Sequence, residues 1–512
     1  MRELRGHAGR WLVAGCALWL LCTAVVAEEI VVRADGPSTP LPHFWERMFG
    51  SGRAVLALRD DYRTDLRATK AATGVRYVRF HHIFSDEVGI YSKDKKGNDV
   101  WNFSYIDQIY DGLLEIGVRP FVELSFMPVK MSSDPNLKFG FWYGPNHAPP
   151  KSYALWDEMM RRFAEHLIDR YGIAEVSTWY FEVWNEPNIG FWGGMPHKQT
   201  YYELYEHTAN ALKAVDPKLR VGGPSTAQAA WVGQFISDMV KKRVPVDFVS
   251  THVYANDTAD NVFGTTEIVP REDMVCRATK KVHDEILASP LPQIPFVMSE
   301  FNASYANEPD VTDSVYMGPW IANMIRECDG YVDDMSYWTF SDVFEEQGIV
   351  KTPFYGGFGL IAERSIHKPA FNAFALLHRL GSQRLAVDST SALATRTEDG
   401  RLVLALWNYA PPVGIGPTYH GPIAAAAPKH FSVRIEGAAA EAAVQVSRVD
   451  AEHGNAVGAF DAMGRPPFPS RKQIDELRAA GQLVPAEQSH LRQGRFEIEV
   501  PAHGLVLLEI GR

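Results

Sequence analysis

Several features that mark other classes of protein are scarce in this sequence. The 512 residues include only four Cys, carry a formal net charge of −11, and show no extended cluster of Lys and Arg. Nucleic-acid-binding surfaces concentrate positive charge, so nucleic acid is not expected as a partner. The composition is 46% hydrophobic and 22% charged, which excludes extended disorder and predicts a globular protein with one large and at least one smaller domain.

Long hydrophobic runs are also missing. The apolar stretch Trp11–Leu21 is too short for a stable membrane span. Three Arg precede it and small residues follow it, which predicts a signal peptide over residues 1–27, cleaved after about Ala27. The protein is then exported, to the periplasm or outside the cell. An alternative interpretation is lipoprotein anchoring at Cys16.

Two of the four Cys leave with that signal, and Cys276 and Cys328 remain. The pattern places Cys276 at the start of one barrel helix and Cys328 at the end of the next. Parallel helices would separate these positions by about 20 Å, whereas a disulfide needs Cα atoms within about 7 Å. The sequence therefore predicts two free thiols.

Motifs for cofactors and metals are absent. The segment Gly50-Ser51-Gly52-Arg53 lacks the third Gly of a dinucleotide-binding turn. His81 and His82 have no His-Glu-x-x-His motif or Cys/His cluster beside them. We expect neither a metal nor another cofactor.

The middle of the chain, residues 48–380, alternates nearly continuous apolar strands with amphipathic helices. Continuous apolar strands are typical of parallel sheets that are covered on both faces. The pattern predicts a (β/α)8 TIM barrel, an α/β fold, and favours it over an open doubly wound sheet. The expected strands are Met48–Gly50, Tyr77–Phe84, Val118–Phe126, Thr178–Trp184, Leu219–Gly222, Phe248–Tyr254, Pro295–Phe301 and Met335–Phe340.

Residues 381–512 have a different sequence pattern, in which short strands are separated by turns. This pattern predicts a β-sandwich. One surface helix is expected over Ser470–Leu483. Residues 28–47 precede the barrel and contain a strand at Glu29–Arg33. We expect this strand to pair into the sandwich, which makes that domain discontinuous.

Two glutamates follow or end strands of the expected barrel, where active sites of this fold lie. Glu186 stands in Asn185-Glu186-Pro187 after the fourth strand, and Glu300 stands in Ser299-Glu300-Phe301 on the seventh. Two carboxylates about 5–5.5 Å apart suit retaining glycoside cleavage, one as nucleophile and one as proton donor. Asn185 is placed to bind a sugar hydroxyl.

Six segments of the chain match a known family: Gly50–Ala54, Arg79–His81, Glu182–Asn188, Thr251–Tyr254, Ser299–Asn302 and Trp338–Glu346. Through them the chain resembles glycoside hydrolase family 39, the β-xylosidases and α-L-iduronidases. The resemblance implies that Glu186 is the acid/base and Glu300 the nucleophile, in agreement with the argument from the residues.

Further substrate-binding residues are expected around the pair. His252 and Tyr254 alternate with Val253 and so share one side of the sixth strand. The resemblance implies that they line the sugar site, together with His81. Trp338 is expected to stack on the sugar ring, and Glu345 to hold a hydroxyl.

The residue at position 254 also helps to predict which sugar is bound. Family iduronidases place a Lys two residues after the His of strand six, and this chain has Tyr254 there. We therefore predict a retaining, exo-acting β-D-xylosidase that releases xylose from the non-reducing end of xylo-oligosaccharides. The alternatives are an α-L-iduronidase-like or α-L-arabinosidase-type enzyme and, in another class, a catalytically silent carbohydrate-binding protein of the cell envelope.

Overall fold

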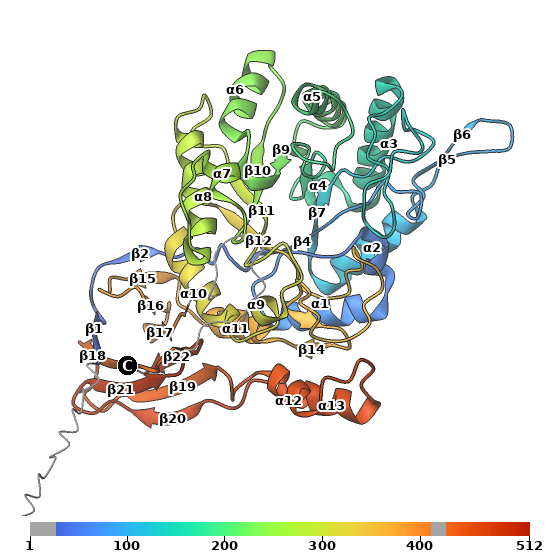
Figure 1. The fold of residues 1–512 in the computed structure, drawn as a ribbon. Helices are drawn as coiled ribbons and strands as arrows, with labels where there is room; N and C mark the ends of the chain where they lie inside the picture. Colours follow the sequence, from blue (N-terminus) through green and yellow to red (C-terminus); the bar gives the residue numbers. More distant parts are fainter. Residues whose placement is uncertain (1–26, 411–425, 512) are drawn as a thin grey trace, which may run out of the picture.

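The structure is a computed structural model, and it describes residues 27–410 and 426–511. The predicted signal peptide and Cys16 lie almost wholly outside the described residues. Two bodies follow one another, an α/β barrel and a β-sandwich (Figure 1). No helix among the described residues is both long and apolar enough to cross a membrane.

The barrel is closed by eight parallel strands that pair in the order of the sequence. This confirms the predicted fold class. The strands are β3 (Met48–Gly50), β4 (Tyr77–Phe80), β7 (Arg119–Glu123), β8 (Tyr180–Glu182), β9 (Arg220–Thr226), β10 (Phe248–Tyr254), β11 (Phe296–Asn302) and β12 (Asp334–Tyr337).

Helices surround this barrel. They are α1 (Asp60–Ala72), α2 (Ser104–Ile116), α3 (Tyr153–Tyr171), α4 (Ile173–Val176), α5 (His197–Val215), α6 (Val232–Lys242), α7 (Ala259–Phe263), α8 (Arg271–Leu287), α9 (Pro309–Thr312), α10 (Met317–Cys328) and α11 (Pro369–Leu377). Local signals set several helix ends: the Ser152 hydroxyl accepts a hydrogen bond from the Leu155 amide at the start of α3, and Gly117 ends α2 in the left-handed conformation. The loops also carry short pairs, β5 (Tyr91–Lys93) with β6 (Asp99–Trp101) and β13 (Ile361–Ala362) with β14 (Ile366–His367).

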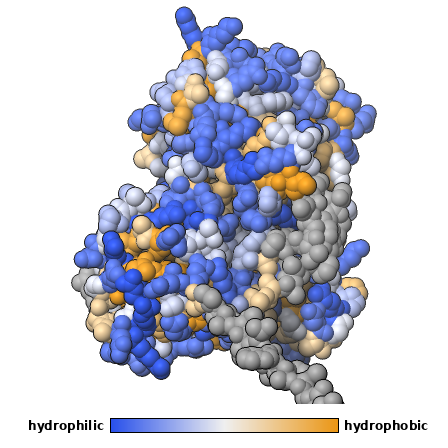
Figure 2. All heavy atoms as spheres, turned by 60° about the vertical axis from the view of Figure 1, so that its left-hand side comes forward, coloured by the Kyte–Doolittle hydropathy of each residue, from blue (hydrophilic) through white to orange (hydrophobic). Residues whose placement is uncertain are grey.

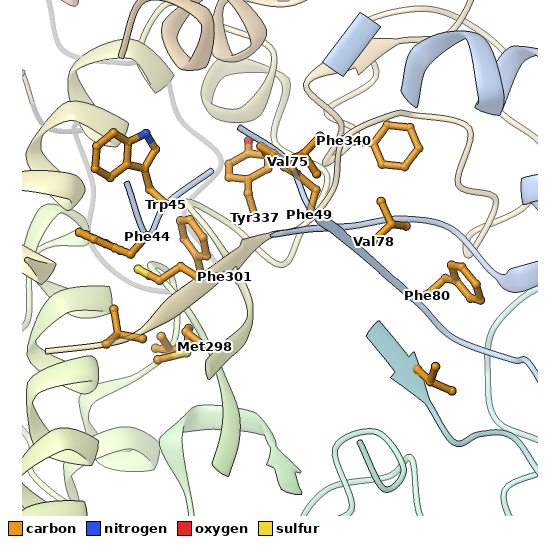
Figure 3. Packing of buried hydrophobic residues seen from close by; sticks show 14 of the residues in the cluster. Phe44, Trp45, Phe49, Val75, Val78, Phe80, Met298, Phe301, Tyr337 and Phe340 are labelled. Carbon is orange, nitrogen blue, oxygen red and sulfur yellow. The ribbon is translucent and has the colours of Figure 1, made fainter. Parts of the chain in front are cut away.

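Hydrophobic side chains fill the space between strands and helices. Figure 3 shows part of this core, with Phe49, Phe301 and Tyr337 from three strands close together. The Phe374 ring of α11 meets the rings of Phe49 and Tyr337 edge-on at centroid distances of 5.2 and 5.3 Å. Inside the barrel a separate layer closes the end where the strands begin: Met48, Phe121, Tyr180, Phe248 and Val297. The cluster of buried carboxylates around Arg79 lies toward the opposite end.

The C-terminal body consists of two facing sheets around a second core. The small sheet is β1 (Glu28–Arg33), β18 (Lys429–Glu436) and β21 (Arg495–Val500); the strand expected at Glu29–Arg33 is β1, and it runs parallel to β18. The large sheet contains β2 (Ser38–Pro40), β15 (Gln383–Leu385), β16 (Ala392–Arg396), β17 (Leu402–Trp407), β22 (Leu505–Ile510), β19 (Ala443–Val449) and β20 (Glu487–His490). Between β19 and β20 lie α12 (Ala456–Ala462) and α13 (Arg471–Ala480).

The main hydrophobic core of the barrel extends into the large sheet of the sandwich. Trp407 and Leu505 of the large sheet belong to the same buried cluster as the barrel helices α10 and α11. The hydroxyls of Tyr316 and Tyr409 are 2.8 Å apart across the junction. On the outside, the face shown in Figure 2 carries mainly hydrophilic side chains, with hydrophobic ones in small separate patches.

The prediction of two free thiols is wrong, because Cys276 and Cys328 form a disulfide with their Cα atoms 4.9 Å apart. The helices do run in parallel, but α10 is only 12 residues long and is shifted toward the beginning of α8. The Trp320 indole donates to the Arg271 carbonyl at 3.2 Å, so the early part of α10 lies level with the first residue of α8. This shift brings Cys328 level with Cys276.

The disulfide closes a loop with a sequence separation of 52 residues. Loop-closure entropy for this length stabilises the folded state by about 4 kcal/mol. We expect the double variant Cys276→Ala/Cys328→Ala to unfold at a clearly lower denaturant concentration than the oxidised wild type. Reductant should lower the wild type to the same level and leave the variant unchanged; equal stability of all samples would contradict the prediction.

Candidate active site

A cavity of about 300 Å³ opens at the end of the barrel where the strands terminate. It contains six of the eight residues singled out in the sequence: His81, Asn185, Glu186, Tyr254, Glu300 and Trp338. The other lining residues are Phe141, Ile189, Phe191, Ala227, Gln228, Asp257, Tyr305, Glu346, Gln347 and Phe358. The volume is at the small end of the usual range for ligand pockets, which suits one sugar unit and the bond that follows it.

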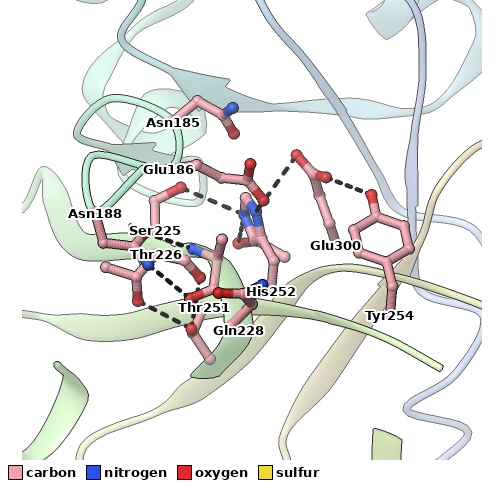
Figure 4. A network of polar contacts seen from close by, with 12 residues as sticks. Asn185, Glu186, Asn188, Ser225, Thr226, Gln228, Thr251, His252, Tyr254 and Glu300 are labelled. Carbon is pink, nitrogen blue, oxygen red and sulfur yellow. Dashed lines mark hydrogen bonds and ion pairs between the residues drawn. The ribbon is translucent and has the colours of Figure 1, made fainter. Parts of the chain in front are cut away.

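Glu186 and Glu300 face one another across this cavity (Figure 4). Glu300 is part of β11, whereas Glu186 lies beyond β8 in a left-handed conformation with φ of 44°, its amide donating to the Ser225 carbonyl at 2.7 Å. One carboxylate oxygen of each lies within 4.8 Å of the other and of a ring nitrogen of His252. This proximity suits the double displacement of a retaining reaction.

A buried cation holds Glu300 in place. Arg79 of β4 is fully buried and donates to Glu300 Oε1 and to Glu182 Oε2, each at 2.6 Å. It also contacts Glu123 Oε2 at 2.8 Å and donates to the Asn185 side-chain oxygen at 3.0 Å. Arg79 thus binds only the oxygen of the Asn185 side chain and not its amide protons. The Asn185 side chain lines the cavity.

The surroundings give the two glutamates different affinities for a proton. Burial, the charge of Glu300 and the charge of Asp257 raise the pKa of Glu186 well above its ordinary value. Burial also raises the pKa of Glu300, but Arg79, His81 and the Tyr254 hydroxyl act in the opposite direction. Glu186 therefore keeps its proton to a higher pH than Glu300.

Two residues of β10 fix the positions of the carboxylates. The Tyr254 hydroxyl donates to Glu300 Oε2 at 2.6 Å, and His252 Nδ1 lies 2.9 Å from Glu186 Oε1. Burial, reinforced by the charges of Arg79 and His81, lowers the pKa of His252 well below its usual value. The His252 ring is therefore neutral. It lies behind Glu186 and is not among the residues that line the cavity.

His81 and Trp338 form one wall. His81 Nδ1 lies 2.5 Å from Glu123 Oε2, and its ring is 4.8 Å from the Trp338 ring. A Cβ atom on Gly50 would lie 2.1 Å from the Trp338 ring, so only glycine at that position leaves room for the indole. The first glycine of the Gly50-Ser51-Gly52 segment therefore serves to make room for Trp338. A comparison with dinucleotide-binding motifs could not show this role.

Glu345 does not reach the cavity. Its carboxylate is bound by Arg53 at 3.0 Å and by Arg59 at 2.6 Å, and the neighbouring Glu346 lines the cavity instead. The left-handed backbone at Glu345, with φ of 68°, separates the directions of the two side chains. Glu346 Oε1 lies 3.6 Å from His81 Nε2.

Sequence reasoning also missed Arg79, Glu346, Gln228 and Asp257 as site residues. Arg79 lies within the quoted Arg79-Phe80-His81 segment, and an Arg inside an apolar strand was a usable signal. The Gln228 amide approaches Asp257 Oδ1 at 3.4 Å on the side of Glu186. Gln228 has a left-handed backbone, with φ of 62°, and no local sequence pattern predicts that conformation.

Two groups of described residues have atoms near enough to share a metal ion. One is Glu186, His252 and Glu300; the other is His43, Glu46 and His378, outside the cavity. In the first, Arg79 already supplies a positive charge to Glu300. In the second, both imidazoles hydrogen-bond to Glu46 at 2.7 and 2.9 Å. The absence of a metal stays a prediction.

Removing Arg79 should destabilise the whole fold. The variant Arg79→Gln leaves Glu123, Glu182 and Glu300 buried without their shared cation, which costs about 3–5 kcal/mol. Chemical denaturation at neutral pH should show the loss, and part of it should be recovered at lower pH as the carboxyl groups become protonated. A variant as stable as the wild type would contradict the role assigned to this side chain.

Comparisons with known proteins agree with this geometry. The model of the glycosyl hydrolases family 39 matches residues 28–496. A β-xylosidase of Geobacillus stearothermophilus is 39% identical over 481 residues, 91% of this chain and 92% of the relative, and one of Caldicellulosiruptor saccharolyticus is 34% identical over 91% and 95%. The crystal structure of a monomeric β-xylosidase from Caulobacter crescentus CB15 is 33% identical, with a TM-score of 0.85, and covers 94% of this chain and 99% of its own. The chain therefore belongs to glycosyl hydrolase family 39 and is a glycosidase.

Proposed function

We propose that the protein is a retaining, exo-acting β-D-xylosidase. The observation that carries this proposal is the pair of buried carboxylates, with oxygens within 4.8 Å, in a cavity sized for one sugar unit. The relatives with 34–39% identity over 91% of the chain are named β-xylosidases, which supports the choice of sugar.

In this mechanism Glu300 is the nucleophile and Glu186 the acid/base. A Glu300 oxygen forms a bond to the anomeric carbon while the glycosidic C–O bond breaks and the leaving oxygen takes the proton of Glu186. Water then attacks the same carbon, gives a proton back to Glu186 and releases Glu300. Arg79 and Tyr254, both bonded to Glu300, favour its ionised form before attack.

The lining of the cavity favours an uncharged pentose over a uronate. None of the described lining residues is a Lys or Arg, while Glu186, Asp257, Glu300 and Glu346 are all acidic. A uronate carboxylate would be repelled there and would find no paired cation. The same walls admit an arabinoside, because sugars that differ by one small group are discriminated only modestly.

Hydrolysis of 4-nitrophenyl glycosides tests the proposal. We expect turnover of the β-D-xyloside, less of the α-L-arabinoside, and none of the α-L-iduronide. Glu186→Ala should lose about 10²–10⁴-fold with unactivated xylobiose, whereas Glu345→Gln, a carboxylate outside the cavity, should retain most of the activity.

Azide assigns the two roles separately, because one displacement inverts the anomeric centre and two displacements retain it. With an activated aryl xyloside, Glu186→Ala should give β-xylosyl azide and Glu300→Ala should give α-xylosyl azide. The reverse products would exchange the two assignments. A folded wild type that turns over none of the glycosides would point to a carbohydrate-binding protein.

The charge of Asp257 should affect the pH profile. Burial raises the pKa of Asp257 to about 6, so its carboxylate is charged above that pH and raises the pKa of Glu186. In Asp257→Asn, Glu186 loses its proton at lower pH, and the alkaline limb of kcat/KM should move toward acid. Asp260→Asn changes an exposed residue at the start of the following helix α7 and should not shift the limb; an unshifted limb in both variants would contradict the prediction.

We also propose export of the protein, with the signal peptide removed after about Ala27. The Cys276–Cys328 disulfide supports this, since disulfides persist in oxidising compartments. N-terminal sequencing of the protein made in its native host should begin near Glu28, and an intact Met1 would overturn the proposal.

A further inference from the structure

A second cavity, outside the catalytic one, lies between the loop after β12 and the start of α13. It measures about 450 Å³. We call it the basic groove and define it by four cationic residues and one aromatic residue of its lining: Lys351, Arg364, Arg471, Arg478 and Phe468. It shares no lining residue with the catalytic cavity.

The groove has the opposite charge to the molecule as a whole. Glu363 is the one acidic residue of its lining, and Asp475 outside the lining lies 3.5 Å from Arg478. The lining itself thus carries three net positive charges on a chain whose formal net charge is −11. Glu363 lies 3.9 Å from Arg364, whose side chain is 66% exposed. Arg478 donates to the Arg364 carbonyl at 2.8 Å, which ties α13 to the loop. Such a concentration of cations selects an anionic ligand.

Phe468 adds an unpacked aromatic surface. Its side chain is 80% exposed, more than any other large hydrophobic residue that the structure describes. Pro467 and Pro469 flank it and restrict the backbone that carries the ring. An exposed ring beside cations suits a ligand with an apolar face and a negative group, as a uronic acid has.

The groove lies close to the catalytic cavity along the chain. Gln347 lines the cavity and Lys351 lines the groove, and four residues span at most about 14 Å. The other side of the groove is held firmly, because Phe460 of α12 and Leu477 of α13 pack against Phe354 in a common buried cluster. In Figure 1, α12 and α13 lie beside β14 of the barrel loops.

We propose that the basic groove binds uronic acid units of an acidic polysaccharide whose chain end is the substrate of the catalytic cavity. The identification of the polysaccharide backbone as a xylan rests on the proposed function. The catalytic cavity has acidic residues and no described cationic lining residue, so it disfavours a uronate; the groove supplies both the cations and the aromatic ring that such a unit needs. The groove would thus tether decorated chains close to the site that trims their ends.

Isothermal titration with two probes tests this: xylotetraose carrying one glucuronic acid, and unsubstituted xylotetraose. The measurements use a Glu300→Ala background, so that neither probe is hydrolysed. We expect the acidic probe to bind about fivefold tighter, and Arg471→Glu to abolish that difference. Phe468→Ala should weaken the acidic probe alone. Lys472→Glu, a neighbouring charge outside the groove, is the matched control and should change neither affinity.

The proposal is overturned if the acidic probe binds no tighter than the neutral one, or if Lys472→Glu acts as strongly as Arg471→Glu. It is also overturned if DNA or anionic vesicles bind through Arg471 and Phe468 while the acidic probe does not. Aryl xyloside turnover by Arg471→Glu, with the natural Glu300, should equal that of wild type. A wild type that binds the acidic probe but cleaves no xyloside would refute the proposed function and leave groove binding standing.

Discussion

The buried guanidinium of Arg79 is the interaction on which the site depends. It brings together carboxylates from three different barrel strands, Glu123, Glu182 and Glu300, which would otherwise repel one another in a medium of low dielectric constant. It also orients Asn185. The barrel can therefore place several acidic groups at one end only because a fixed, planar cation stands between them, with separate donors for each.

The interior of the barrel is also asymmetric along its axis. Aromatic and aliphatic side chains fill the end where the strands begin, and this layer excludes water from beneath the polar network. The hydrogen bonds to Glu186 and Glu300 are made by buried groups, which strengthens them, while the neighbouring charges separate the proton affinities of the two carboxyl groups.

Much of this could be predicted from the sequence. Continuous apolar strands at regular spacing predicted the barrel, and Asn185-Glu186-Pro187 with Ser299-Glu300-Phe301 predicted the pair of glutamates that the structure brings together. Features that depend on how far one element is shifted along another, or on the conformation of a single turn, could not be predicted from the sequence. The shift of α10 along α8 decides whether two cysteines meet, and the left-handed backbone at Glu345 decides which of two adjacent glutamates enters the cavity. Sequence periodicity fixes the face of an element but not its height or its turns.

The Cys276–Cys328 disulfide also changes what a break in the chain can do. It spans the segment that carries Glu300 and β11, between α8 and α10. A protease that cuts once between the two cysteines produces two polypeptides, yet they stay covalently joined and cannot diffuse apart. Strand β11 then remains at high local concentration beside its partner strands and can re-form its pairing after a transient opening. The bond thus allows the fold to recover from a single cut in this segment.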